Sequence, residues 1–528
     1  MSKVLTVVSV LNEQCVKTYP ISTPAEIDAA MNCARKAEAL WAQVGIRQRV
    51  KLLAHIQSLI LGDLDNIVEV IMHATGKVKT EVLLGEVYPV LALLSYYEKN
   101  ASSILAATAV HTAPLLFPQA NAGFERCPYG VVAIISPWNF PFQLTLAPLL
   151  TALFSGNAVI FKVSEMSLPV GELILHLLSR LTLPEGLVQQ VVGLAETGEQ
   201  LINARPDLVF FTGGLDAGRK VMAKAAQHPI PVILELGGKD AMLVFADANL
   251  ERASKAALYG AFSNSGQVCV SVERCYVEAA CYADFVDRLN HSVAGLKVGH
   301  GAEGDLGALT TLKQFTVIEA HYNDALAKGA KASSALRLEG RYLYPVLLWD
   351  VTHDMLVMRE ESFGPLLPVM AFDTEVQAVK LANASDYGLN ASVWSQDISK
   401  AERVARQLQV GNWAVNDVIK NIGHAGLPFG GCKNSGFGRY HGAEGLLQFT
   451  YTVAGLTSRS CLNDEPNWFQ YSDRRYGEML GFIDLMFGSG LLIQRIVRNW
   501  QALQAFRGYA SLNLRQHWQN FLIWILNR

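Results

Sequence analysis

The sequence predicts an α/β protein built on two doubly wound parallel sheets. Three observations support this class: a helical pattern over the first hundred residues, and two successive regions, 130–238 and 240 to about 415, in which short β-rich runs alternate with helical segments. A chain of 528 residues exceeds what one hydrophobic core organises, so two or three domains are expected.

The first region, from residue 24 to about 105, is predicted to be helical. Ala29, Cys33, Ala37 and Trp41 recur at fourfold spacing, and long stretches lack Gly and Pro. This pattern predicts a layer of amphipathic helices.

The second region alternates strands with crossover helices, which is the usual architecture for dinucleotide binding. Its predicted strands are Val131–Ile135, Ala158–Phe161, Val188–Val192, Leu208–Phe211 and Val232–Leu234. The third region continues the pattern with Ala241–Phe245 and Cys275–Val277. We found no internal repeat.

Composition excludes several classes of function. A net charge of −3 and a pI near 6.5 do not fit a nucleic-acid-binding protein, which would present a basic surface. Eight scattered cysteines indicate a reducing compartment rather than a disulfide framework, and the six-residue spacing of Cys269, Cys275 and Cys281 is not a zinc pattern, so no metal is expected. Without a signal-peptide pattern or an apolar run of roughly 18 residues, a cytoplasmic protein is expected.

Cys269 follows a Gly-Gln pair, and taken alone it would more often be a packing residue than a nucleophile. Its neighbours in the sequence change that interpretation. Six short segments occur in order: Pro137–Pro141, Phe211–Gly214, Glu235–Lys239, Gly266–Cys269, Glu360–Pro365 and Pro428–Gly436. Together they closely resemble the aldehyde dehydrogenase superfamily, from about residue 20 to about residue 457.

The resemblance implies a catalytic set of Cys269, Glu235 and Asn139. The Cys269 thiolate would attack an aldehyde carbonyl, the Asn139 amide and the Cys269 N–H would stabilise the resulting alkoxide, and Glu235 would activate the water that hydrolyses the thioester. Taken alone, Asn139 could be a turn residue between two prolines. Glu235 could be a charge at a helix N-terminus or a surface partner for Lys239. Relatives that transfer the acyl group to coenzyme A generally lack the glutamate, so a free carboxylate product is favoured.

The resemblance also implies a cofactor site, for NAD with NADP as the alternative. Lys162 and Glu165 match the contacts to the adenosine ribose, and a carboxylate there accepts bonds from a 2′-OH but repels a 2′-phosphate. The pyrophosphate would meet a helix opened by Gly213, Gly214 and Gly218 rather than a GxGxxG loop. Position 214 is commonly a serine in the family, so one hydroxyl contact is missing.

The remaining cofactor contacts implied are Trp138, Leu236, Glu361 and Phe363, of which Glu361 would hold the nicotinamide ribose and Phe363 would line the ring's pocket. The glycine-rich segment 428–438 is interpreted as a loop near the substrate entrance without a catalytic role.

By the same resemblance the chain divides into a dinucleotide-binding domain (1–105 and 128–236), a catalytic domain (237–445), a β-flap for oligomerisation (106–127 and 446–457) and a helical extension (458–528). A homodimer or homotetramer is expected.

The extension lies outside the resemblance. Leu492, Ile496, Trp500, Leu503 and Phe506 fall on one helical face, beside Arg495 and Arg498, and a second apolar group, Trp518 to Leu526, ends the chain. Such helices either lie in a membrane interface, which would place the protein peripherally on a membrane, or pack on the enzyme itself or a neighbouring subunit. A membrane position would suit a fatty, terpenoid or carotenoid aldehyde. The alternatives are an NADP-preferring or semialdehyde-specific enzyme, and a catalytically silent, membrane-associated relative.

Overall fold

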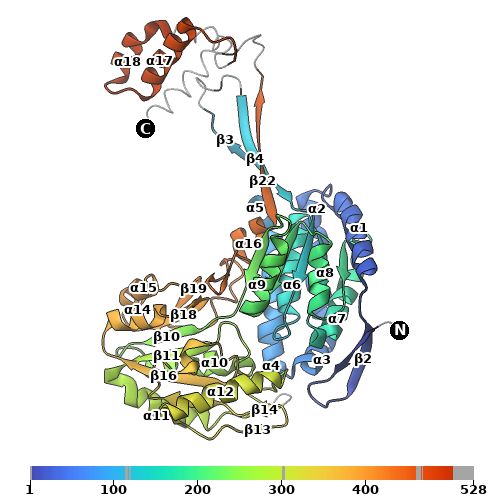
Figure 1. The fold of residues 1–528 in the computed structure, drawn as a ribbon, viewed down its shortest axis with the longest axis vertical. Helices are drawn as coiled ribbons and strands as arrows, with labels where there is room; N and C mark the ends of the chain where they lie inside the picture. Colours follow the sequence, from blue (N-terminus) through green and yellow to red (C-terminus); the bar gives the residue numbers. More distant parts are fainter. Residues whose placement is uncertain are drawn as a thin grey trace. The chain divides into compact units, whose positions relative to one another are not determined.

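The computed structural model describes residues 3–112, 117, 120–299, 304–459, 465 and 468–502. The chain divides into two compact units (Figure 1): the first is Met1–Leu105 with Cys127–Tyr451, and the second is Ala106–Arg126 with Thr452–Arg528. The first unit contains two large, mostly parallel sheets, and the predicted α/β class is confirmed.

Helices cover most of the first hundred residues, as predicted. They are α1 (Pro24–Trp41), α2 (Ile46–Gly62), α3 (Leu64–Thr75), α4 (Lys79–Val82), a π turn (Leu83–Val87) and α5 (Tyr88–Ile104). Thr23 and Glu26 form a capping box that starts α1. A hairpin of β1 (Val4–Val8) and β2 (Cys15–Pro20), which the sequence did not suggest, precedes them.

The predicted apolar stripe of α1 is only partly correct. Ala37 and Trp41 are buried, but Ala29 is exposed and Cys33 is half-buried. A strict spacing of four residues drifts by about 40° per step around a helix of 3.6 residues per turn. The buried face therefore follows mixed spacings of three and four: Ile27, Met31, Ala34, Ala37 and Trp41.

The first sheet has six strands in the order β21-β9-β8-β5-β6-β7. Its strands are β5 (Val131–Ile135), β6 (Ala158–Lys162), β7 (Val188–Gln190), β8 (Leu208–Thr212), β9 (Val232–Glu235) and the antiparallel β21 (Gly436–Phe437). The connecting helices are α6 (Gln143–Ser155), α7 (Leu168–Ser179), α8 (Ala195–Asn203) and α9 (Leu215–Ala225). The five predicted strands are all present, within two residues of the expected bounds.

The second sheet has seven strands in the order β12-β15-β16-β11-β10-β18-β19, and only the edge pair β12/β15 is antiparallel. The strands are β10 (Asp240–Val244), β11 (Val272–Glu278), β12 (Lys331–Ala332), β15 (Val346–Trp349), β16 (Leu366–Phe372), β18 (Asn390–Trp394) and β19 (Asn412–Val415). The helices around it are α10 (Leu250–Phe262), α11 (Tyr282–Val293), α12 (Lys313–Ala327), α13 (Leu356–Arg359), α14 (Glu375–Asn383) and α15 (Ile398–Ala405).

Both faces of the second sheet are covered. Along β10, Ala241 and Leu243 join one hydrophobic cluster, whereas Met242 and Val244 join another. Because successive residues of a strand point to opposite faces, a buried cluster on each side is what a doubly wound sheet requires.

The second unit contains a three-stranded sheet, ordered β22-β4-β3, and a pair of helices. Its elements are β3 (Thr108–Val110), β4 (Ala120–Pro128), β22 (Thr450–Ser458), α17 (Asp473–Phe487) and α18 (Leu492–Arg498). The predicted helical C-terminal region is present, and Ile496 lies in α18, but Leu503, Phe506 and the group from Trp518 to Leu526 lie outside the described residues. Among the helices that can be described, none combines the length and hydrophobicity needed to cross a bilayer.

Candidate active site

The predicted cofactor and catalytic residues of the first sheet follow or end neighbouring parallel strands. Asn139 follows β5, Lys162 ends β6, Gly213 follows β8 and Glu235 ends β9. Because β5, β6, β8 and β9 are parallel neighbours, their carboxyl ends meet at one edge, where doubly wound folds bind their ligands.

Cys269 lies on the segment that connects α10 to β11 in the second sheet. Three consecutive residues before it, Asn264, Ser265 and Gly266, have left-handed φ values of 50°, 55° and 74°. A side chain at Gly266 would also meet the backbone of Gly364 at 2.2 Å, so this turn requires glycine. The turn leaves Cys269 half-buried.

The nucleophile segment meets the carboxyl edge of the first sheet. Nδ2 of Asn139 donates a hydrogen bond to the main-chain oxygen of Gln267 at 3.0 Å. A Cβ atom at Gly238 would lie 2.4 Å from the main-chain oxygen of Cys269, which shows how closely the segment after Glu235 approaches the predicted nucleophile. The structure therefore brings the three predicted catalytic residues together.

Glu235 is buried at the end of β9, and neither carboxylate oxygen has a hydrogen-bond partner within the described part of the chain. Burial raises its pKa well above the usual value, and only the positive charge of Arg439 opposes that shift. The interpretation of Glu235 as a partner for Lys239 is wrong, because Nζ of Lys239 pairs with Glu273 at 2.5 Å.

The pKa of the Cys269 thiol is raised by burial and further by the carboxylates of Asp240, Glu361 and Glu235. A thiol with a raised pKa needs a nearby base to become a thiolate.

Sequence reasoning missed three buried polar residues in or beside this site. Asp240 is buried with one unpaired carboxylate oxygen, and burial raises its pKa well above normal. Tyr440 interacts electrostatically with both Glu235 and Cys269, and burial raises its pKa. His441 is buried with neither ring nitrogen hydrogen-bonded among the described residues, and burial lowers its pKa to about 4.

Tyr440 lies near Glu235 because the glycine-rich segment before it pairs with the end of β9. That segment was interpreted as an entrance loop, but it contains β21, which pairs Gly436 with Glu235. The main-chain N–H of Leu236 also donates to the carbonyl of Ser435 at 3.1 Å. Strand pairing over two hundred residues of sequence leaves no local signal.

At the predicted adenosine contacts, Lys162 is buried and its amine donates to the carbonyl of Val163 at 3.3 Å. Burial lowers its pKa, whereas Glu165 and Glu196 raise it. Glu165 is exposed at the start of a short 3-10 helix, and its Oε2 accepts the Ser164 hydroxyl at 3.3 Å, which leaves Oε1 to accept from a ribose hydroxyl. Glu196, in the first turn of α8, is a second carboxylate that the sequence did not single out.

On the pyrophosphate side, α9 begins directly after Gly214, as predicted. A Cβ at Gly213 would lie 2.6 Å from the ring of Phe211, and one at Gly218 would lie 2.5 Å from Leu236, whereas Gly214 has open space around it. The exposed main-chain N–H groups of this helix start suit a phosphate, and a serine hydroxyl at 214 would fit sterically.

On the nicotinamide side, Trp138 and Phe363 meet edge to face with ring centres 5.5 Å apart. Glu361 accepts the main-chain N–H of Gly238 at 3.1 Å, and burial raises its pKa to about 8. Aromatic surfaces beside a carboxylate are the groups that a nicotinamide riboside needs, so the residues present fit the predicted cofactor.

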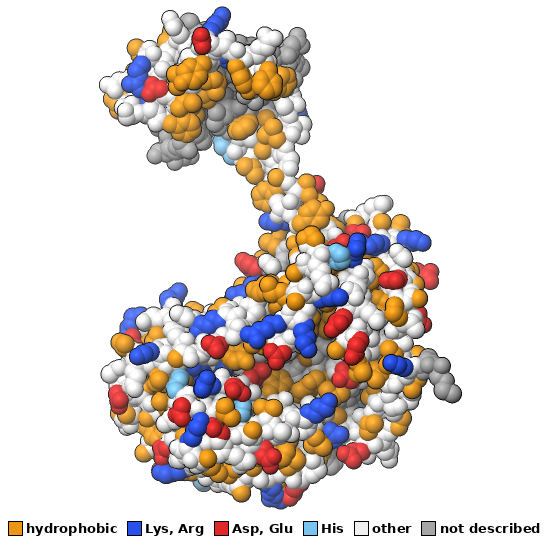
Figure 2. Space-filling view, in the orientation of Figure 1, with side chains coloured by type: hydrophobic (Ala, Val, Ile, Leu, Met, Phe, Trp, Pro, Cys, Tyr) orange, Lys and Arg blue, Asp and Glu red, His pale blue; other side chains and the backbone are white. Residues whose placement is uncertain are grey.

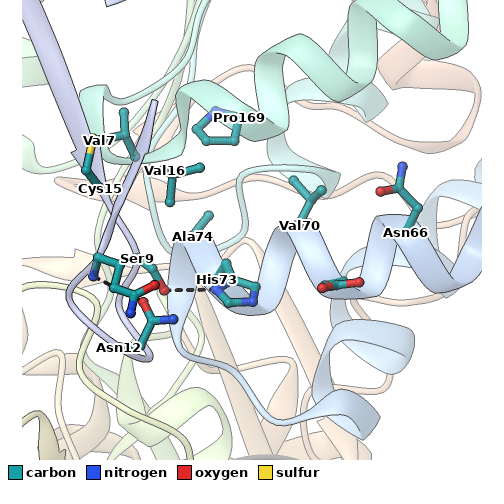
Figure 3. A pocket seen from close by; sticks show the side chains of 12 residues that line it. Val7, Ser9, Asn12, Cys15, Val16, Asn66, Val70, His73, Ala74 and Pro169 are labelled. Carbon is teal, nitrogen blue, oxygen red and sulfur yellow. Dashed lines mark hydrogen bonds between the residues drawn. The ribbon is translucent and has the colours of Figure 1, made fainter. Parts of the chain in front are cut away.

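A cavity of about 400 Å³ lies elsewhere in the first unit, beside the N-terminal hairpin (Figure 3). Val7, Ser9 and Cys15 line it from the hairpin segment and His73 lines it from α3, where His73 Nδ1 lies 2.9 Å from the Ser9 hydroxyl. None of the predicted catalytic or cofactor residues lines it.

The fold and these side chains are those of a nucleotide-dependent dehydrogenase. The model of the aldehyde dehydrogenase family matches residues 1–454, and the chain belongs to that family. The predicted class, an NAD(P)-dependent aldehyde dehydrogenase, is confirmed.

Individual relatives differ in their substrates and cofactors. The chain is 60% identical to a 4,4'-diapolycopene aldehyde oxidase of Methylomonas sp over 513 residues, 97% of each chain. It is 32% identical to a putative NADP(+) succinate-semialdehyde dehydrogenase of Mycobacterium ulcerans, over 87% of this chain and 90% of that one. The crystal structure of betaine aldehyde dehydrogenase from Staphylococcus aureus in complex with NAD+ superimposes with a TM-score of 0.83 at 28% identity, covering 89% of this chain and 94% of that one.

Proposed function

We propose that this enzyme oxidises a long, apolar aldehyde of the carotenoid class to its carboxylate, with NAD+ as the acceptor and Cys269 as the nucleophile. The observation that carries the reaction is Glu235, a buried carboxylate without a hydrogen-bond partner among the described residues, next to Cys269 and Tyr440. An unsatisfied buried carboxylate costs free energy, which a role in proton transfer explains.

Cys269 forms a bond to the aldehyde carbon, and its thiol proton leaves to a nearby base. The Asn139 amide donates to the alkoxide that develops on the former carbonyl oxygen. NAD+, held by Lys162 and Glu165 at one end and by Glu361 and Phe363 at the other, would supply the hydride acceptor that the oxidation of this adduct to a thioester requires. Glu235 then removes a proton from water as the water attacks the thioester, which releases the carboxylate and returns the thiol.

The proposed substrate class rests on how much of the chain aligns with one relative. The Methylomonas protein aligns over 513 residues, so the similarity must continue past residue 454, where the family model ends, into the C-terminal extension. The semialdehyde dehydrogenases, which cover 87% of this chain or less at about half that identity, support the alternative substrate less well.

We assign NAD as the preferred acceptor because the exposed carboxylate of Glu165 follows the buried Lys162 at the ribose position. NADP carries a phosphate where this carboxylate would accept a hydroxyl, so we expect a preference for NAD of about tenfold or more in kcat/KM.

The test is NADH formation with a carotenoid aldehyde in vesicles, a fatty aldehyde, vanillin and succinic semialdehyde, each with NAD and with NADP. The proposal expects the carotenoid aldehyde to exceed the semialdehyde by about tenfold or more in kcat/KM, since each buried methylene adds about 0.8 kcal/mol of binding. A preference for the semialdehyde would overturn the proposed substrate class while leaving the reaction intact.

We also propose that the helices of the second unit bind a lipid surface, where such an aldehyde would reside. Hydrophobic side chains gather over α17 and α18 (Figure 2). The exposed large ones are Trp468, Phe469, Tyr471, Tyr476, Leu480, Ile483, Phe487, Leu491, Ile493, Val497 and Trp500. Trp and Tyr beside aliphatic residues are typical of membrane interfaces.

Three arginines of α17 and α18, within the described part of the extension, pair with groups of the same two helices, and we propose that the binding is mainly apolar rather than electrostatic. Arg498 pairs with Asp484 at 2.5 Å, Arg495 donates to the carbonyl of Leu485 at 3.0 Å, and Arg474 pairs with Glu478 at 3.0 Å. The whole protein should therefore sediment with zwitterionic phosphatidylcholine vesicles equally at low and at high salt. Failure to sediment would contradict this proposal and favour packing of the helices on the protein.

A further inference from the structure

A buried ion pair, Lys77 with Glu86, lies between the end of α3 and the start of α5. Nζ of Lys77 is 3.0 Å from Oε1 of Glu86, and solvent reaches neither side chain. Burying two charges carries a desolvation penalty that their attraction does not always repay, so such a pair is weak evidence of stability. The groups that it contacts are a better guide to its purpose.

The ammonium of Lys77 binds the turn that carries Asn139. It donates a hydrogen bond to the main-chain oxygen of Asn139. It also lies 4.2 Å from the centre of the Phe140 ring, over the ring face. The ammonium thus combines one hydrogen bond, one ion pair with Glu86 and one contact with an aromatic ring.

The carboxylate of Glu86 holds the next part of the same turn. Its Oε2 accepts the main-chain N–H groups of Phe142 at 3.0 Å and Gln143 at 2.9 Å. Phe142 is the N-cap residue of α6 and gives it no side-chain cap, so Glu86 satisfies amides that would otherwise be unpaired in the interior. The ion pair therefore binds the main chain of the turn at two places, at Asn139 and at the start of α6.

The local sequence explains how the pair reaches this turn. Pro89 has no N–H to donate to the carbonyl of Gly85, and the π turn Leu83–Val87 lies at this point of the helix. A Cβ at Gly85 would lie 2.7 Å from Cε1 of Phe140, so the ring packs directly on the helix backbone. Glu86, the next residue, is consequently directed into the interior.

We infer that Lys77 and Glu86 are positioning residues that hold Asn139 where its side-chain amide can donate to the oxyanion. The Asn139 amide gives one N–H to the carbonyl of Gln267, and its other N–H is the one that can meet a substrate oxygen. Fixing the main chain of Asn139 from behind limits how far that N–H can move, and donors placed before the reaction are what oxyanion stabilisation requires. This inference rests on the oxyanion role proposed above for Asn139.

The experiment measures the rate of the first NADH burst per titrated Cys269 thiol, with KM values for NAD and aldehyde, in K77M, N139A and the double variant. N139A should lower the burst about 100-fold or more. K77M should lower it about tenfold or more, because small displacements of a catalytic group are costly, with both KM values within about twofold. In the N139A background, K77M should add less than about threefold, since Lys77 acts through Asn139.

The matched control is R49M, which removes another buried cation whose guanidinium donates to the carbonyls of Phe154 and Val44. It should lose stability but keep the burst rate per thiol. If K77M does not fold, G85A displaces Phe140 without removing a charge and should show the same burst defect.

An additive effect of K77M in the N139A background, or equal defects in K77M and R49M, would overturn the inference alone. An unchanged burst in N139A would instead remove the proposed role of Asn139.

Discussion

The Cys269 site and the C-terminal helices depart from the usual distribution of side chains in opposite ways. At the site, buried polar atoms lack partners in the described structure, as the carboxylate oxygens of Glu235 and one of Asp240 illustrate. On α17 and α18, large apolar side chains face solvent, with Ile493 75% and Phe487 65% exposed. A buried carboxylate without a partner is typical of a catalytic site, whereas an exposed apolar face is typical of a surface that binds a partner or a membrane.

The two regions also differ in how firmly they are held. All thirteen residues of α6, which starts just after Asn139, are buried, but only Phe482, Leu485 and Met486 are buried along the fifteen residues of α17. Groups that must be placed within a fraction of an ångström need the first environment. A surface that binds a deformable partner such as a lipid bilayer can be formed by a helix as exposed as α17. The following variants distinguish the catalytic site from this surface.

The largest expected effect is that of C269A. Removing the thiol removes the covalent step, so NADH formation with any aldehyde should fall by at least about 10⁴-fold. Vesicle binding should not change, because the exposed face of the second unit is intact. The control is the removal of another described free cysteine, in C432A. Retained turnover in C269A would exclude Cys269 as the nucleophile.

The next effect is that of E235Q on hydrolysis. The amide cannot accept a proton from water, so steady-state turnover should fall about 100-fold or more, while the first turnover still gives a burst of NADH. Rapid mixing with absorbance at the NADH band separates the two phases, and E339Q, on an exposed glutamate, is the control. Full steady-state activity would show that Glu235 is not the essential base.

The fold was predictable where each element carries its own pattern. The runs at 131–135 and 208–211 became β5 and β8 because a β-branched and aromatic run between turn signals fits a buried parallel strand. The stripe of α1 failed at Ala29 because periodicity was read at exactly four residues. The N-terminal hairpin was missed because its strands are short and mostly exposed.

The site was predictable only as far as residues occur in recognisable segments. Cys269, Glu235 and Asn139 each lie in such a segment. Asn139 and Glu235 follow or end parallel strands of the first sheet, and the segment before β11 of the second sheet brings Cys269 to that edge. Tyr440, His441 and Asp240 were not predicted, since their roles depend on which strands pair and on what is buried. The unpaired state of Glu235 is a property of three-dimensional packing that no local sequence displays.

A third effect concerns stability: E235Q should be more stable than the native protein, although it is less active. A glutamate in an unfolded chain titrates near about 4.3. Because burial raises the pKa of Glu235, the folded state holds its proton more tightly, and its contribution to stability falls as pH rises above that value. Glutamine removes this loss. The free energy of unfolding of E235Q should therefore be higher by about 1–3 kcal/mol, which is about 1–3 °C in apparent Tm for a chain of this size.

Thermal melts at pH 5.5 and 8.5 check this sign. The excess of E235Q over the native protein should be larger at pH 8.5. A pH-independent difference, or one that reverses, would mean that Glu235 is paired in the folded protein.

The smallest expected effect is that of F487S on the C-terminal helices. Phe487 is largely exposed, so its loss should change the free energy of unfolding by no more than about 0.5 kcal/mol. If its ring enters lipid, losing about 1 kcal/mol of apolar burial should weaken vesicle partition about fivefold. V376S is the matched control, since Val376 is a 79% exposed apolar residue on α14 of the first unit. Weaker turnover of a water-soluble aldehyde in F487S, with unchanged partition, would mean that these helices contact the enzyme rather than a membrane.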